Sequence, residues 1–363
     1  ARAEQIFRSL LQNNPEISLS GRILVALGNT YAYQGKWTDA IHACEQSLQI
    51  FITLGQPINQ AKSKKQIAVA CCRGFIAGDF GVEWLYQGET HCHEALALLQ
   101  EETDNIWLIG SIFSTLGSLN TYLQRWERAL DYYQRDLAIC EQLNDQHGMG
   151  ISYLNLGEVY QRRTGPDLPR ALDAYHQALA IFRRYQNRYL EADLLTNLGS
   201  LYLALGEQPS AIDAYTQAIA VIERLRTNVS AADARANFFA TMVQTYASLI
   251  QLYIAQPDAA AAFNLVERAR ARTFIELLAE QSIAPPIAAP PTLIEQEQHL
   301  RQHLNELYAA PPADSHHLTQ TTEQLDALLQ QIRLLASEYT DLRTVQPLTH
   351  AEIQQRLPAT VAL

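Results

Sequence analysis

Glycine, proline, lysine and cysteine are all scarce in this chain, and each scarcity excludes a class of protein. The 363 residues include only 16 glycines and 14 prolines, fewer than the turns of an all-β fold require, so the composition favours helices. Lysine is rare, and the formal net charge of −11 argues against nucleic acid as a partner, because nucleic-acid binding needs a basic surface. No apolar run reaches the roughly 18 residues of a membrane-spanning helix, so we expect no membrane partner.

The placement of the five cysteines favours free thiols. Five is an odd number, and Cys71 and Cys72 are adjacent, which is an unfavourable geometry for a disulfide. Reduced thiols are typical of cytoplasmic proteins, and the chain does not open with the charged and then apolar segments of a leader. We therefore expect a cytoplasmic protein. Because the chain begins at Ala1 and ends at Leu363 within a sequence pattern, we also expect it to be a piece of a longer one.

One pattern recurs along the chain, most clearly around Gly28, Gly117, Gly157 and Gly199. An apolar or aromatic residue lies four positions before each glycine, and leucine lies one position before it. Alanine follows by 12 positions and tyrosine or cysteine by 16, with two extra residues in the copy at Gly157. The first positions fall on one stripe of a helix and the last on one stripe of a second helix. Small residues on the facing stripes let the two backbones approach closely.

This pattern resembles the tetratricopeptide repeat (TPR), with a longer period. Spacings of 40 residues (Gly117 to Gly157) and 42 residues (Gly157 to Gly199) exceed the usual period of about 34, as in the long-helix variant of kinesin light chain. The resemblance implies an all-α fold in which helical pairs stack into a right-handed TPR superhelix. It also implies a protein or peptide ligand, held in the concave groove that the first helices line.

Weaker copies of the pattern complete the array. They surround Cys71 and Ile250, while Phe7 and Leu10 match the second-helix stripe of a pair whose first helix is missing. We therefore predict a leading helix and six helical pairs over residues 1–280.

The remaining residues change in composition. Residues 281–292 are rich in proline and predict an extended linker, residues 293–340 predict an antiparallel helical hairpin, and residues 341–363 would begin a further domain. The stretch 262–278, with its Glu-Arg-Ala-Arg-Ala-Arg core, resembles the last repeat of bacterial TPR–CHAT proteins, in which a helical hairpin precedes a caspase-like CHAT domain. That resemblance implies the recognition or regulatory arm of a CHAT-type cysteine protease, whose catalytic His and Cys would lie beyond Leu363. A stand-alone TPR scaffold or regulator is the alternative.

Two histidine clusters raise the question of a metal site. His91 and His93 flank Cys92, and His299 and His303 are four residues apart. Residues two apart on a helix point away from each other, and no third ligand accompanies the second pair, so both patterns favour structural roles over zinc. No phosphate-binding loop stands out either. We predict no metal, no cofactor, no catalytic residue and no enzymatic activity in this chain.

The predicted binding surface is the face of each first helix opposite its packing stripe. Asn155 and Asn197 occupy the same offset in neighbouring copies, and in the scaffold arrays that this chain resembles an asparagine there pairs with the backbone of a bound peptide. An amide suits this role because it donates and accepts hydrogen bonds; the alternative is a polar residue that merely faces solvent. The same face also contains Arg22, Asn29, Tyr33, Tyr122, Glu158, Arg162 and Asp193, together with Lys65, Phe75 and Ser118.

A basic cluster near the end of the repeats is a second candidate surface. Arg268, Arg270 and Arg272 follow one another at intervals of two. They are either a docking site for the downstream domain or a solvated helix face.

Overall fold

The computed structural model describes residues 2–12, 16–99, 105–228, 232–256, 259–280, 290–309 and 315–335. These residues form α-helices and their connections, and no strand occurs among them. The chain divides into two compact units, Ala1–Ile181 (unit 1) and Phe182–Leu363 (unit 2). The all-α fold that the sequence predicts is confirmed.

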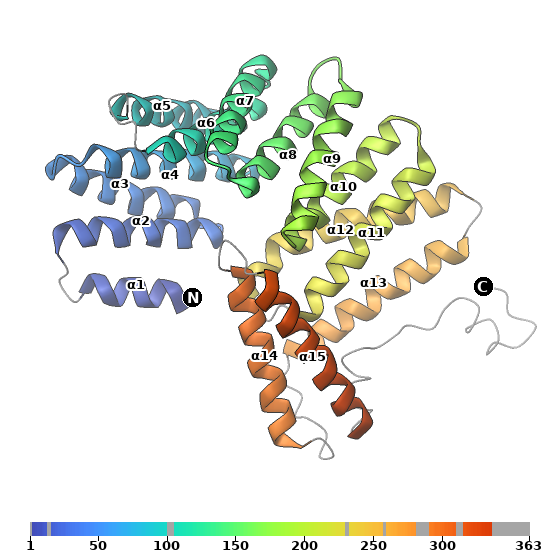
Figure 1. Cartoon of the computed structure of the whole chain (residues 1–363). Coiled ribbons are helices and arrows are strands. Elements are labelled where there is room, and N and C mark those ends of the chain that lie inside the picture. The colour runs from blue at the N-terminus through green and yellow to red at the C-terminus, as the bar shows by residue number, and fades with distance from the viewer. Residues whose placement is uncertain are drawn as a thin grey trace, which may run out of the picture. The chain divides into compact units, whose positions relative to one another are not determined.

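Unit 1, coloured blue to green in Figure 1, contains α1 (Arg2–Gln12), α2 (Ile17–Tyr33), α3 (Trp37–Thr53), α4 (Pro57–Ile76), α5 (Glu83–Leu98), α6 (Ile106–Tyr122), α7 (Trp126–Gln142), α8 (Gln146–Arg162) and most of α9 (Leu168–Arg184). The leading helix α1 packs on α2, and the pairs α2–α3, α4–α5 and α6–α7 are each in extensive contact. Successive pairs also meet through their first helices, because α4 contacts both α2 and α6, and α6 contacts α8. This arrangement is that of a helical-repeat array.

The ends of these helices follow from local chemistry. Gly35 after α2 and Gly78 after α4 have φ values of 72° and 83°, in the left-handed region that glycine adopts without steric cost. At the start of α8, a carboxylate oxygen of Asp145 accepts a hydrogen bond from the backbone N–H of Gly148 at 2.9 Å. That bond satisfies one of the free donors at the helix N-terminus.

The recurring glycines lie where the two helices of a pair approach most closely. A Cβ on Gly157 would come within 2.5 Å of the ring of Tyr175, and one on Gly117 within 2.6 Å of the ring of Tyr133. The hydroxyls of Ser118 and Tyr133 also share a hydrogen bond of 3.0 Å. The close approach that the sequence pattern predicts is therefore made by a glycine on one helix and a buried aromatic ring on the other.

Unit 2, yellow-green to red in Figure 1, contains the end of α9 and then α10 (Arg188–Ala204), α11 (Gln208–Asn228), α12 (Ala232–Ala255), α13 (Ala259–Glu280), α14 (Pro291–Ala309) and α15 (Ser315–Leu335). Gly199 of α10 repeats the packing of unit 1, since a Cβ there would come within 2.6 Å of the ring of Tyr215. After the pair α12–α13, helices α14 and α15 form the expected antiparallel hairpin around Ile294, Leu328 and Ile332.

Some expectations differ from the structure or lie outside it. In α1, Phe7 and Leu11 pack against the core, while Leu10 is 44% exposed, so the expected stripe is rotated by one residue. Most of the linker 281–292 and the whole of 341–363 lie outside the described residues. Among the described helices, none is both long and apolar enough to span a membrane.

Candidate binding groove in unit 1

A cavity of about 730 Å³ lies in unit 1 among α2, α3, α4, α6, α7 and α8, and we call it the groove cavity. The first helices α2, α4, α6 and α8 supply most of its lining. Because stacked pairs place their first helices on the concave wall, the cavity occupies the surface where a repeat array offers a binding site.

Helix α4 gives the cavity a cationic wall. Lys65 and Arg73 line the cavity, with Val69 between them. Neither cation forms an ion pair with a carboxylate in the part of the chain that the structure describes. Burial lowers the pKa of the Lys65 ammonium, and the charge of Arg73 lowers it further. The sequence of α4, from Pro57 to Ile76, contains no Asp or Glu at all.

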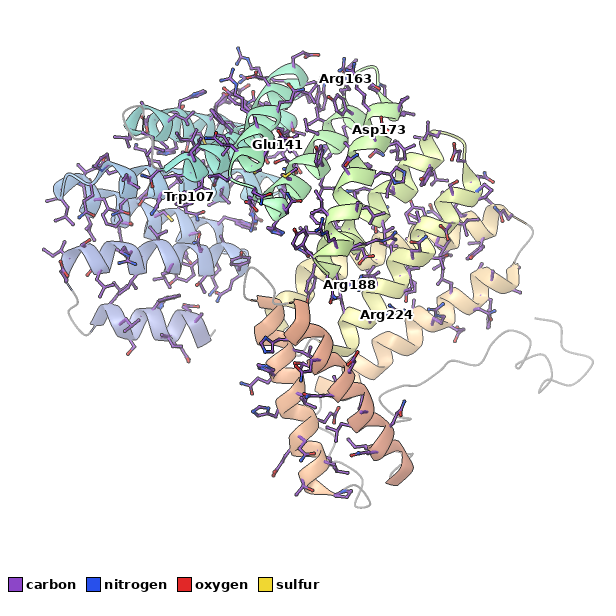
Figure 2. All side chains as sticks on the ribbon, viewed as in Figure 1. Trp107, Glu141, Arg163, Asp173, Arg188 and Arg224 are labelled. Atoms are coloured by element: carbon purple, nitrogen blue, oxygen red, sulfur yellow. The ribbon has the colours of Figure 1, made fainter. Side chains whose placement is uncertain are left out.

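Two large aromatic side chains line the same cavity while remaining largely exposed. Tyr33 of α2 is 70% exposed, and Trp107 of α6, labelled in Figure 2, is 50% exposed. A cation from α4 lies over each ring: the guanidinium of Arg73 is 5.9 Å from the centre of Tyr33, and the ammonium of Lys62 is 5.4 Å from that of Trp107. Exposed aromatic rings beside cations are the kind of surface that protein ligands cover.

Each carboxylate that lines the cavity already has a partner. Asp136 of α7 is buried, and its Oδ2 accepts a hydrogen bond of 2.7 Å from the hydroxyl of Ser152 in α8. Burial raises the pKa of the Asp136 carboxyl to about 6. Asp145 caps α8, as described above, and Glu158 pairs with Arg162 one turn further along the same helix.

The structure brings together five of the residues that the sequence assigns to the groove. Asn29, Tyr33, Tyr122, Asn155 and Glu158 all line the groove cavity. They come from the first helices α2, α6 and α8, and Lys65 of α4 and Ser118 of α6, at equivalent offsets, join them.

The other predicted residues of unit 1 lie outside the lining. Arg22 is an exposed residue of α2. Arg162 pairs with Glu158, and its guanidinium lies 5.3 Å from the centre of the Tyr122 ring. Phe75, which shares the groove offsets, packs edge-to-face on Tyr122 at 6.0 Å and belongs to the edge of the core.

Asp193 and Asn197 belong to α10 in unit 2, where both are half-buried. Asn155 and Asn197 therefore fall in different units, and only Asn155 lines the groove cavity. No partner accompanies the Asn155 amide within the described part of the chain, so its donors and acceptor remain available to a ligand.

The arginine cluster lies on α13. The Arg268 guanidinium pairs with Glu223 of α11 at 2.7 Å, which ties α13 to the repeat array. The side chains of Arg270 and Arg272 lie outside the described residues. The docking role of this cluster therefore stays a prediction.

The histidine and cysteine patterns separate in space. Cys92 is fully buried in the core of unit 1, His91 is half-buried and His93 is exposed. On α14, His299 and His303 are both exposed. Within the described ranges, no three His, Cys, Asp or Glu side chains are grouped so that they could hold a metal ion. All five cysteines are buried and free of disulfides.

Trp107, Arg73 and Asp136 are among the lining residues that the repeat pattern does not predict. Trp107 lies ten positions before Gly117, one helical turn before the first position of the predicted binding face. Arg73 lies two positions after Cys71, between the predicted binding face and the packing stripe. Asp136 comes from a second helix and reaches the cavity because Gly110 leaves room: a Cβ on that glycine would come within 3.2 Å of its Oδ1. The glycine in α6 was the available signal for this approach.

Comparisons with known proteins agree with this architecture. Residues 22–54, 113–146 and 167–224 each match a family model described as tetratricopeptide repeat. No curated protein sequence matches the chain.

Three solved structures share the fold at low sequence identity. A Rap protein complexed with competence and sporulation factor is 16% identical, with 88% of this chain and 80% of that chain covered and a TM-score of 0.54. Aspartyl phosphate phosphatase F from Bacillus subtilis is 13% identical, with 90% and 73% covered and a TM-score of 0.52. The apo form of RapI is 12% identical, with 90% and 99% covered and a TM-score of 0.50.

The helical pairs, the glycine–tyrosine contacts and the family matches together define a tetratricopeptide-repeat array. Arrays of this class present extended concave surfaces to other proteins. The chain is accordingly a protein–protein interaction module.

Proposed function

We propose that this protein binds a peptide or an extended segment of a partner protein in the groove cavity of unit 1. The observation that supports the proposal is the cavity itself, a volume of about 730 Å³ lined by successive first helices. Its lining combines exposed aromatic rings with amides and hydroxyls, a mixture suited to burying side chains while hydrogen-bonding a peptide backbone.

Asn155 is the residue that tests the backbone contact. A bound extended chain has N–H and C=O groups that need partners once water is displaced. Replacing Asn155 with Ala leaves such groups unpaired and should weaken binding by about tenfold. Tyr33→Ala should also weaken binding, because the ring is 70% exposed and has contact area to offer a ligand.

The experiment compares binding of a partner by the wild type and by the Asn155→Ala and Tyr33→Ala variants, with melting curves beside it. Asp131→Asn is the matched control, because Asp131 is an exposed residue of α7 outside the groove cavity. Leu156→Ala is the opposite control: Leu156 is 5% exposed, so its loss should cost about 2–5 kcal/mol of stability. If folded Asn155→Ala and Tyr33→Ala proteins keep wild-type affinity for every partner, the groove is not the binding site.

The role of the whole protein is a further proposal, with two forms. The Glu267–Arg272 stretch and the α14–α15 hairpin favour the recognition or regulatory arm of a CHAT-type cysteine protease, by their resemblance to TPR–CHAT proteins. The alternative is a stand-alone scaffold or regulator. The sequence encoded after codon 363 separates them: a strand–helix domain with a His–Cys pair supports the first, and an immediate stop codon supports the second.

A further inference from the structure

Among the described residues, the negatively charged side chains that line the groove cavity have hydrogen-bond or ion-pair partners, whereas its positively charged side chains have no carboxylate partner. The lining carboxylates of Asp136, Asp145 and Glu158 accept hydrogen bonds or ion pairs from Ser152, Gly148 and Arg162. The two α4 cations that line the cavity lack such partners, because neither Lys65 nor Arg73 forms an ion pair with a carboxylate in the described residues. Within the described chain, the cavity therefore contains two positive charges without a carboxylate partner, and a negatively charged ligand would complement them.

Among the described residues that line the cavity, positive charge is confined to helix α4. The chain carries a net charge of −11, so the protein as a whole repels acidic partners. Three of its four lysines nevertheless lie on α4, together with Arg73 and without any acidic residue. Within the described residues, Lys64 forms an ion pair of 2.6 Å with Glu94 of α5, and no such pair involves Lys62, Lys65 or Arg73. An acidic ligand is thus attracted at α4 and disfavoured elsewhere.

The spacing of these cations limits the shape of the ligand. Lys65, Val69 and Arg73 stand four residues apart along one ridge of α4, so Lys65 and Arg73 are separated by about 12 Å along the helix axis. An extended chain rises about 3.3 Å per residue, and its side chains at positions i, i+2 and i+4 point to the same side. Residues i and i+4 of such a chain are about 13 Å apart, which matches the two cations.

We propose that the groove cavity takes an extended segment of a partner protein in which two acidic residues stand four positions apart with an apolar residue midway. The two carboxylates meet Lys65 and Arg73, and the apolar side chain meets Val69. This assignment rests on the proposed function and names the class of partner that the same groove recognises. A single terminal carboxylate satisfies one cation only, so an internal segment fits the ridge better.

Burial of Lys65 agrees with this geometry. Because burial disfavours the charged form of Lys65, a carboxylate placed beside the ammonium would raise the pKa that burial lowers. Tyr33 and Trp107 cover the ligand on the neighbouring helices, where the rings remain exposed in the free protein.

The test begins with an unbiased selection of random peptides on the full chain. Enrichment of acidic pairs at a spacing of four, with an apolar residue between them, supports the proposal. A peptide from that set is then compared with versions in which Gln replaces either acid, and with one in which the acids stand three apart and so point to opposite sides. We expect each change to weaken binding by about tenfold.

The protein variants for the same measurement are Lys65→Gln and Arg73→Gln, with Lys64→Gln as the matched control. All three remove one positive charge from α4, but Lys64 already pairs with Glu94 outside the cavity lining. We expect about a tenfold loss for the first two and less than about a twofold loss for the control. Double-mutant cycles that combine each protein variant with each Gln-substituted peptide show which acidic residue of the peptide interacts with Lys65 and which with Arg73.

The outcomes separate this inference from the function on which it rests. If selected peptides lack the acidic pair, and depend on Asn155 and Tyr33 but not on Lys65, the groove binds peptides and the acidic motif is wrong. Equal losses for the variants at Lys64, Lys65 and Arg73 would also overturn it, since only overall charge would then matter. If no peptide binds in a way that depends on any lining residue, the groove proposal fails as well.

Discussion

The ring of Tyr175 lies directly against Gly157, so that a Cβ on the glycine would come within 2.5 Å of ring carbons. The Tyr175 hydroxyl donates a hydrogen bond of 2.8 Å to Oε1 of Gln161, one turn beyond the glycine on the same helix. One side chain of α9 thereby sets both the distance to α8 and the alignment of the two helices.

Gly157→Ala should destabilise the repeat array. Alanine favours the helix by about 1 kcal/mol, but overpacking a core costs about 1–3 kcal/mol, and the fully buried Tyr175 has no room to move. We expect a lower midpoint of denaturation by circular dichroism. The midpoint is the quantity to compare, because repeat arrays do not unfold in a strictly two-state manner. In a background that carries Tyr175→Ala, the same glycine substitution should no longer destabilise; a full loss there would refute the contact.

The buried carboxyl of Asp136 should make stability depend on pH. Its pKa is about 6 in the folded protein, above the ordinary value of 3.8, because burial disfavours the charged form. The folded state therefore binds the proton more tightly than the unfolded state does. The contribution of Asp136 to the free energy of unfolding is fully present below pH 3.8 and is lost as the pH rises to about 6. Asp136→Asn should stabilise the protein above pH 6 by up to about 3 kcal/mol and have little effect near pH 4.

Melting curves of the wild type and Asp136→Asn across this range measure the difference. Asp131→Asn, an exposed carboxyl of the same helix, is the control and should leave the pH profile unchanged. A pH-independent difference between Asp136→Asn and the wild type would show that the carboxyl is not desolvated.

In unit 2, replacing Glu191 should lower the stability of the protein more than replacing an exposed acidic residue does. Glu191 is 4% exposed, and it pairs with Arg183 at 3.1 Å and with Arg188 at 2.6 Å. Glu191→Ala removes the acceptor for both guanidinium groups and should cost about 2 kcal/mol of stability. Asp131→Ala, which breaks an exposed pair with Arg135, should cost less than about 0.5 kcal/mol. Equal losses in urea denaturation would contradict this ranking.

The cysteines should be inert in the folded protein. Burial raises the pKa of the Cys44, Cys71 and Cys72 thiols to about 12 and that of Cys140 to about 11. Cys92 is fully buried, and its pKa is raised as well. Because the thiolate is the reactive form, a thiol reagent at pH near 8 should label the native protein slowly and all five cysteines after denaturation. Rapid labelling of any of them in the native state would contradict the packing.

The repeat pattern predicts local pairing well, because the glycine stripe and the aromatic stripe are both properties of single helices. Asn29, Tyr122 and Asn155, which the pattern assigns to the groove face, line the cavity. Phe75, which the pattern assigns to the same face at a different offset, packs on Tyr122 and does not line the cavity.

The reason is that the rotation of each first helix is fixed by its neighbours and not by its own sequence. Around Cys71, where the anchor is not glycine, α4 places Arg73 in the cavity instead of Phe75. A count of positions from the anchor carries no information on that rotation. Contacts between successive pairs, such as α4 with α6, supply it.

The scarcity of lysine has a practical consequence for experiments on this protein. Of four lysine side chains, those at 62, 64 and 65 lie on the helix that walls the groove, and the fourth, at 36, precedes α3. Modification of lysine side chains, which in most proteins is spread over the whole surface, is therefore confined here to α4 and one short connection. Cross-linking mass spectrometry through lysine would report on the occupancy of the groove without any engineered label.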